Sequence, residues 1–234
     1  MNRIDTTEDS RRRLLIQALA AGFFSAGWYR GQGFAATPKS IFRVIGTVIV
    51  NDRPAKADTL IGPNAKLRTE KNSELIAVLG ELAIIVRAGS EIVVGDKVSD
   101  LRVIRGNLLA AAAPGEYRIQ TSIATIVERS KNTQDGVGFY VEAKEHLTYF
   151  CTCYGVSEIS VNDDDAIKDT VVADHHDRPV NIYRETTRKK RIENATFKNH
   201  TDEELKLIGE LIGHVAPFMG GRLGQTFQET PRIS

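Results

Sequence analysis

The amino-acid sequence predicts a mainly β fold, either a β-solenoid or a flattened β-sandwich, with a short C-terminal helix. From position 40 to about position 184, short β-favouring runs recur roughly every 8 to 12 residues, with Gly, Pro, Asn or Asp between them. No helical stretches separate these runs, whereas a parallel α/β sheet would need them. Alternation, as at Tyr117, Ile119 and Thr121, gives each strand one face on the core.

The predicted strands cover most of the chain after position 40. They are 41–50, 74–79, 82–87, 91–94, 101–105, 107–111, 116–121, 123–128, 137–142, 147–153, 156–161, 170–173 and 180–183. Glycine and other turn-forming residues end many of these runs, so we predict short strands joined by tight connections.

One helix is predicted near the C-terminus. Thr201 to Glu204 form a capping box, in which the threonine oxygen accepts an exposed N–H and the glutamate reaches back to the start of the helix. The apolar residues that follow at helical spacing are Leu205, Ile208, Leu211 and Ile212, and Gly213 ends the helix. We expect this helix to cover an edge or end of the β structure.

The N-terminal segment predicts export from a bacterial cytoplasm. Its signal residues are Ser10, Arg11, Arg12, Leu14 and Leu15. A polar residue, paired arginines and an apolar stretch are the layout of a twin-arginine signal. The apolar stretch ends near Tyr29 and is shorter than the roughly 20 residues that span a bilayer. We expect cleavage after Ala35 and a periplasmic location; an uncleaved segment that anchors the protein in the inner membrane is the alternative.

The chain divides into a signal segment (1–35), a β domain (36–190), a helical segment (191–216) and a tail (217–234) that we expect to be disordered. Without the five arginines and three acidic residues of the signal segment, 26 basic and 27 acidic residues remain. Nucleic-acid binding usually needs a basic excess, so no nucleic-acid partner is predicted. The basic cluster Arg188 to Arg191 is expected to be a solvated turn or strand face.

Several short segments between positions 42 and 160 follow a common pattern. They are Gly46-Thr47-Val48, Asn51 to Pro54, Leu60-Ile61-Gly62, Leu67-Arg68-Thr69, 73–78, 91–94, Leu101 to Leu108, 117–121 and 123–126. This arrangement resembles the FecR domain, a periplasmic module named after the ferric-citrate regulator. The resemblance implies stacked short strands in a β-solenoid or flattened sandwich. Family members often carry an Arg-Gly-Thr turn where this chain has Arg129-Ser130 and a longer loop.

Both cysteines, Cys151 and Cys153, lie in one predicted strand, and His175 and His176 follow some twenty residues later. Residues i and i+2 of a strand point the same way, so both thiols project from one face. Their Cα atoms would be about 6.5 to 7 Å apart, at the outer limit for a disulfide. With one or both histidines they would make a Cys₂His or Cys₂His₂ set suited to zinc, copper or iron.

Burial in a core strand is the competing interpretation, because free cysteine behaves as a small hydrophobe. The isolated histidines His146, His200 and His214 are expected to be surface or capping residues. The acidic turn 162–165 lacks the ligand spacing of a calcium loop and is expected to be a solvated hairpin tip.

No nucleophile elbow, HExxH pair, P-loop or dinucleotide fingerprint occurs, so the chain is not predicted to be an enzyme. We expect an exported FecR-like envelope module that binds an unidentified ligand or partner protein in a sensing or structural role. Contact with the membrane is expected only through the N-terminal segment. The alternative is a metal- or haem-associated redox protein that uses Cys151, Cys153, His175 and His176, with a transition metal as cofactor.

Overall fold

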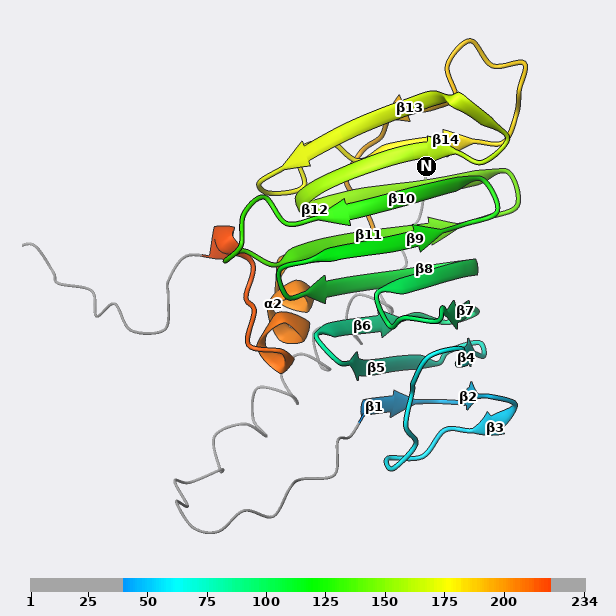
Figure 1. The fold of residues 1–234 in the computed structure, drawn as a ribbon. Coiled ribbons are helices and arrows are strands. Elements are labelled where there is room, and N and C mark those ends of the chain that lie inside the picture. The colour runs from blue at the N-terminus through cyan, green and yellow to red at the C-terminus, as the bar shows by residue number, and fades with distance from the viewer. Residues whose placement is uncertain (1–39, 220–234) are drawn as a thin grey trace, which may run out of the picture.

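The structure, a computed structural model, describes residues 40–219. The predicted signal segment and cleavage site, and the tail beyond position 219, lie outside the described residues. Within residues 40–219 no helix is both long enough and apolar enough to span a membrane. Most of the described chain is β-strand (Figure 1).

The described strands and helices, in chain order, are the following. They are β1 (Ile41–Ile45), β2 (Val48–Val50), β3 (Arg53–Pro54), β4 (Lys66–Thr69), β5 (Glu74–Leu79), β6 (Leu82–Val86), β7 (Glu91–Val94), β8 (Asp100–Ala112), β9 (Glu116–Gln120), β10 (Ala124–Arg129), β11 (Val137–Ala143), β12 (Leu147–Val161), β13 (Asp164–Ala173), β14 (Val180–Tyr183), β15 (Ile192–Asn194), α2 (Asp202–Leu211) and the 3₁₀ helix η2 (Pro217–Met219).

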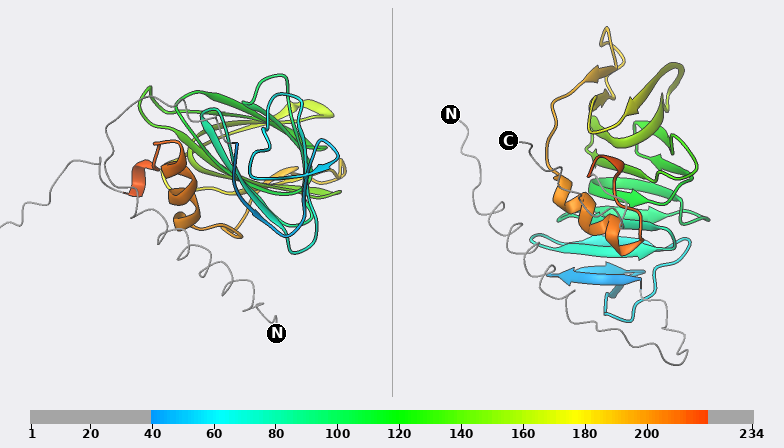
Figure 2. Two further views of the ribbon diagram at one scale, coloured as in Figure 1. Left: turned by 90° about the horizontal axis from the view of Figure 1, so that it is seen from below. Right: turned by 90° about the vertical axis from the view of Figure 1, so that its left-hand side faces the viewer.

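The strands form two sheets that face each other. Sheet A has the order β1-β5-β6-β8-β11-β12-β14-β15. Sheet B has the order β3-β2-β4-β7-β8-β9-β10-β12-β13. The long strands β8 and β12 belong to both sheets, so the two layers are continuous at two places. Figure 2 shows the layers from below.

Each long strand passes from one sheet to the other at a glycine. The first half of β8 pairs with β7 and β9 in sheet B, and from Gly106 onward it pairs with β11 in sheet A. β12 leaves sheet A for sheet B at Gly155. The φ angles of Gly106 and Gly155 are 87° and 128°, values that glycine adopts without the steric cost of a side chain. The sequence prediction broke each strand in two at these glycines and was wrong there.

The prediction of a mainly β fold with one short helix near the C-terminus is confirmed. The solenoid alternative is wrong. Successive coils of a solenoid stack equivalent strands in parallel, whereas the described strands pair antiparallel, except for β8 with β9. The layers face each other as in a flattened sandwich, but the shared strands β8 and β12 join them.

The main core lies between the two sheets. Leu67, Val103 and Ile119 of sheet B are fully buried, as are Phe139 and Phe150 of sheet A. The last two rings stack with centroids 6.0 Å apart. Burial of this apolar surface is the main source of the free energy that holds the layers together.

A second apolar cluster lies on the outer face of sheet A, beneath α2 (Figure 2). It contains Ile85, Leu109 and Tyr140 of the sheet and Leu205 and Ile208 of the helix. The expectation that the helix covers an edge or end of the β structure is wrong. The helix packs on β6 and β8, which are inner strands of sheet A, because its apolar stripe matches the apolar outer residues of those strands.

The capping box of α2 is confirmed. The Thr201 hydroxyl accepts from the Glu204 N–H at 3.3 Å, and the Glu204 carboxylate accepts from the Thr201 N–H at 3.0 Å. Gly213 follows the C-cap Ile212 with a φ of 72°. The expected segment boundaries need two corrections: β15 lies in the expected helical segment because it pairs with β14, and η2 lies in the expected disordered tail.

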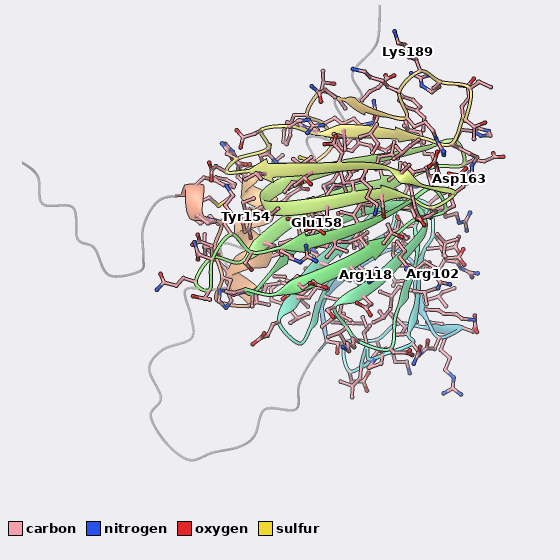
Figure 3. The ribbon with its side chains drawn as sticks, turned by 45° about the horizontal axis from the view of Figure 1, so that its top comes forward. Arg102, Arg118, Tyr154, Glu158, Asp163 and Lys189 are labelled. Atoms are coloured by element: carbon pink, nitrogen blue, oxygen red, sulfur yellow. The ribbon has the colours of Figure 1, made fainter. Side chains whose placement is uncertain are left out.

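The basic cluster is only partly solvated, which corrects the sequence prediction. Arg191 is 5% exposed, and its guanidinium lies 2.8 Å from Asp163 in the turn between β12 and β13. It also donates to the carbonyl oxygens of Tyr183 and Arg184. Figure 3 shows Lys189 at the tip of the loop that follows β14. The buried arginine therefore ties this loop to the acidic hairpin turn, which is exposed as expected.

Candidate metal centre

Four ligand atoms of the described chain converge on one point. Cys151 Sγ, Cys153 Sγ, His176 Nδ1 and His200 Nε2 all lie within 4.8 Å of one another. The Sγ–N distances are 3.4 Å from Cys151 to His176 and 3.4 Å from Cys153 to His200, and the two nitrogens are 3.2 Å apart. Zn–N bonds of about 2.0 Å and Zn–S bonds of about 2.3 Å in a tetrahedron give ligand separations of roughly 3.3 to 3.8 Å. The four atoms therefore already have nearly the spacing of a tetrahedral zinc site.

Strand β12 supplies the two thiols. Cys151 and Cys153 both belong to the cluster on the outer face of sheet A, as the two-residue period of a strand predicts. Both are fully buried, and neither is in a disulfide. A pair of buried thiols on one face, too far apart along the strand to bridge easily, is a suitable half of a metal site.

The connection between β13 and β14 supplies His176. Its φ is 53°, and its backbone N–H donates to the carbonyl of Cys153 at 2.9 Å. This bond holds the loop against β12, and the side chain of His176 is 7% exposed. The neighbouring His175 turns outward, is 49% exposed at its side chain and stacks on Phe218 with ring centroids 4.0 Å apart. The structure therefore brings His176 to the thiols and leaves His175 outside the four-atom cluster.

His200 is the ligand that the sequence prediction missed. It is 2% exposed and its ring stacks on Tyr140 at a centroid distance of 4.6 Å, so the expectation of a surface or capping residue is wrong. It lies 47 positions after Cys153 and meets it only because the chain folds back over sheet A. Its place directly before Thr201, the N-cap of the one predicted helix, is a signal that could have marked it as fixed in space.

Second partners fix the orientation of both imidazoles. His200 Nδ1 lies 2.8 Å from the carbonyl of Lys198, and His176 Nε2 lies 3.0 Å from a carboxylate oxygen of Asp202. Each partner accepts a proton from the nitrogen that faces it, which leaves His200 Nε2 and His176 Nδ1 with a free lone pair toward the thiols. Metal-binding histidines are held in this way in proteins.

The thiols differ in acidity. A hydrogen bond with Cys153, with further hydrogen bonds to His176 and His200, lowers the pKa of Cys151 to about 4 although burial opposes this. Burial and the neighbouring Cys151 raise the pKa of Cys153. For His176, burial lowers the pKa, but the contacts with Cys151 and Asp202 outweigh it and the net shift is upward. One thiolate is thus stabilised beside an imidazole, and thiolate is the form that binds metal.

A pocket of about 350 Å³ opens beside the cluster. It is lined by His175, His176, Phe197, His200 and Asp202, among others. The side chains of His175 and Asp202 are 49% and 42% exposed, and His175 Nε2 is 2.9 Å from the carboxylate. These two residues with His176 form a second, more open group of metal-binding side chains. Since its contacts are all explained by Asp202 accepting hydrogen bonds, we assign it as support for the buried cluster and as the side from which an ion enters.

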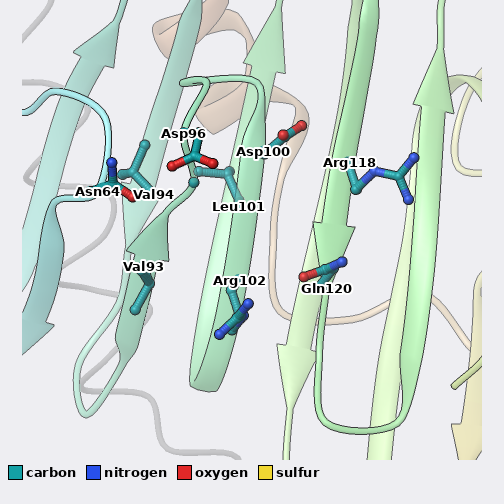
Figure 4. Close-up of a pocket in the computed structure, with 10 residues that line it drawn as sticks. Asn64, Val93, Val94, Asp96, Asp100, Leu101, Arg102, Arg118 and Gln120 are labelled. Atoms are coloured by element: carbon teal, nitrogen blue, oxygen red, sulfur yellow. The ribbon is translucent and has the colours of Figure 1, made fainter.

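Another hollow, of about 320 Å³, lies on sheet B (Figure 4). Arg102 and Gln120 come from neighbouring positions of the parallel pair β8 and β9, and Arg118 lies opposite Asp100. These side chains are exposed or half-buried, and the metal-binding cluster lies on the other sheet. This hollow therefore has no part in the candidate metal centre.

Comparisons with known proteins give little guidance. No family model and no curated protein matches the chain. Two crystal structures of proposed anti-sigma factors from Parabacteroides distasonis ATCC 8503 are similar to part of it, with TM-scores of 0.43 and 0.44 and identities of 10% and 12%. The matches cover 56% and 62% of this chain and 59% and 64% of the neighbours, less than two thirds of either. The FecR resemblance and the export signal stay predictions.

Proposed function

We propose that this protein is a non-catalytic metal-binding module that holds one zinc ion with Cys151, Cys153, His176 and His200. The observation that carries the proposal is the convergence of these four side chains within 4.8 Å, from three separate segments of the chain. Two thiolates and two imidazoles are a ligand set that zinc favours in structural sites.

A structural role is favoured over a catalytic one because the ligand set is complete. Catalytic zinc sites keep an open position for water or substrate, usually with three protein ligands. Here four protein ligands surround the point, and Cys151, Cys153 and His200 are at most 2% exposed. This supports the expectation that the protein binds or senses and does not catalyse a reaction.

A haem is a poorer fit than a single ion. Haem iron takes protein ligands only at its axial positions, so it could use two of the four converging atoms at most. The remaining candidate is a metal-free redox pair of thiols. The low pKa of Cys151 favours a reactive thiolate, although its burial limits access.

The role in the cell follows from the N-terminal prediction and is part of the same proposal. We infer an exported envelope module that presents its β surface to a ligand or partner protein. Twin-arginine export carries folded proteins, so the zinc would be bound in the cytoplasm before translocation. The predicted signal is tested by the location of the protein when Arg11 and Arg12 are replaced by lysine.

Metal analysis of the purified full chain tests the central claim. We expect about one equivalent of zinc in the wild type, and cobalt substitution should give the intense visible absorption of tetrahedral cobalt–thiolate. His200→Gln and Cys153→Ser should each lose most of the bound metal. The matched control is His146→Gln, because the His146 side chain is 78% exposed and lies outside the cluster. A wild-type protein that binds no zinc, cobalt, copper or iron would sink the proposal.

A further inference from the structure

The chain after β15 crosses sheet A and covers the outer apolar cluster. Leu205, Ile208 and Ala216 of this segment are buried against the sheet, and we call residues 195–219 the covering segment. Figure 2 shows α2 lying across the strands. What holds the covering segment on the sheet therefore decides whether this apolar face is accessible.

The start of α2 is bonded directly to the candidate metal centre. His200 supplies a ligand, Thr201 caps the helix, and the carboxylate of Asp202 accepts from His176. Three consecutive residues thus connect the ion to the first turn of the helix. Any change in the position of His200 moves the beginning of α2.

The remaining contacts are weak candidates for holding the segment alone. The helix α2 has 10 residues, and isolated helices shorter than about 12 residues are marginal in water. Its buried ion pair joins Glu204 to Arg87 through two oxygens at 2.9 Å. The desolvation of such a pair offsets much of its attraction, so it adds specificity more than net stability.

We propose that metal binding controls the docking of the covering segment: the segment is docked when the ion is bound, and loss of the ion releases it and uncovers the outer face of sheet A. This inference rests on the proposed metal centre and adds its regulation. Release is local, because the inter-sheet core contains none of the covering segment. The uncovered surface includes Ile85, Leu109 and Tyr140.

Linkage sets the expected size of the effect. If the ion binds only the docked form, free metal at 100 times its Kd favours docking by about 100-fold. Backbone amides of α2 should then exchange with deuterium about 100-fold more slowly with metal than after chelation. Amides of β8 and β11, which lie in the middle of sheet A, should change little.

Hydrogen–deuterium exchange of the full-length chain, with zinc and after chelation, is the test. Faster exchange confined to α2 after chelation supports metal-controlled docking. If the protein binds zinc but α2 exchanges equally in both states, docking does not depend on the ion and this inference fails, while the proposed function stands. If strands and helix exchange faster together, the ion supports the whole fold and local release is wrong.

Variants separate the ligand from the fold. His200→Gln should exchange rapidly in α2 even with zinc present, and it should keep slow exchange in β8 and β11. His146→Gln should behave as the wild type in both states. Slow exchange of α2 in His200→Gln with zinc present would contradict the inference. A wild type without bound metal would instead overturn the proposed function itself.

Discussion

The inner and outer faces of sheet A are both buried, but different chemistry holds what packs on each. Neighbouring residues of one strand serve the two faces: Phe139 and Phe150 point inward, whereas Tyr140 and Cys151 point outward. The inner face meets apolar side chains of sheet B. The outer face meets a segment tied by thiols, imidazoles and the Arg87–Glu204 ion pair. Apolar burial needs no ligand, so the inner core is permanent, whereas the outer contact depends on metal and charge.

The largest effect is expected from the inner face. Phe139→Ala removes a fully buried ring from the inter-sheet core and should lower the free energy of unfolding by about 3 to 5 kcal/mol. Chemical denaturation with and without zinc measures it. The loss should be the same in both conditions, because Phe139 does not touch the covering segment's cluster. A loss that appears only with zinc would show that the two faces are not independent.

The ion pair on the outer face comes next. Glu204→Gln leaves the Arg87 guanidinium buried beside a neutral partner, and breaking such a pair from one side costs about 3 kcal/mol. Deuterium exchange of α2 and chemical denaturation measure this cost. The matched control on the same helix is Glu210→Gln, whose exposed pair with Lys206 should matter by roughly 0.5 kcal/mol or less. Equal effects of the two variants would contradict the assignment of Glu204 as an anchor.

One charged residue breaks the apolar rule of the inner face. Glu128 is fully buried, accepts from the Ser157 hydroxyl, and its Oε1 has no hydrogen-bond partner among the described residues. Burial raises its pKa well above the ordinary value of 4.5. The folded state therefore holds the proton to higher pH than the unfolded state. Stability is fully present below pH 4.5 and falls as the pH rises toward the folded-state pKa.

Glu128→Gln removes this titration. Between the unfolded-state and folded-state pKa values, wild-type stability should fall by about 1.4 kcal/mol per pH unit, and the variant should lack that slope. Denaturation at a series of pH values from 4 upward, on the order of one unit apart, measures the difference. Parallel profiles for the two proteins would show that Glu128 is ionised in the folded state or does not remain buried.

The smallest effect tests the helix cap. Thr201→Ala removes the side-chain oxygen that accepts from the Glu204 N–H and should cost about 1 kcal/mol. Thr201→Ser keeps the oxygen and should cost much less. The expected signature is faster exchange in the first turn of α2 with unchanged zinc content. If zinc is lost as well, the cap and the metal site are more tightly coupled than separate contacts would be.

Some of this arrangement could be predicted from local pattern alone. The two-residue period of a strand placed Cys151 and Cys153 together, and the capping box located α2. The choice between His175 and His176 could not be made, because it depends on the φ of 53° that turns the His176 side chain inward. His200 was missed for a different reason. Its contact with Cys153 spans 47 positions and leaves no local pattern.

The sequence by itself determined the elements whose causes are local: strands from alternation, turns from glycine, the helix start from Thr201 and Glu204. The tertiary structure alone decided that Gly106 and Gly155 carry β8 and β12 from one sheet to the other instead of ending them. It also decided that His200 joins the thiols. Both outcomes depend on which distant strands are available for pairing and packing. Such contacts are selected by the free energy of the whole fold, and short stretches of sequence do not encode them.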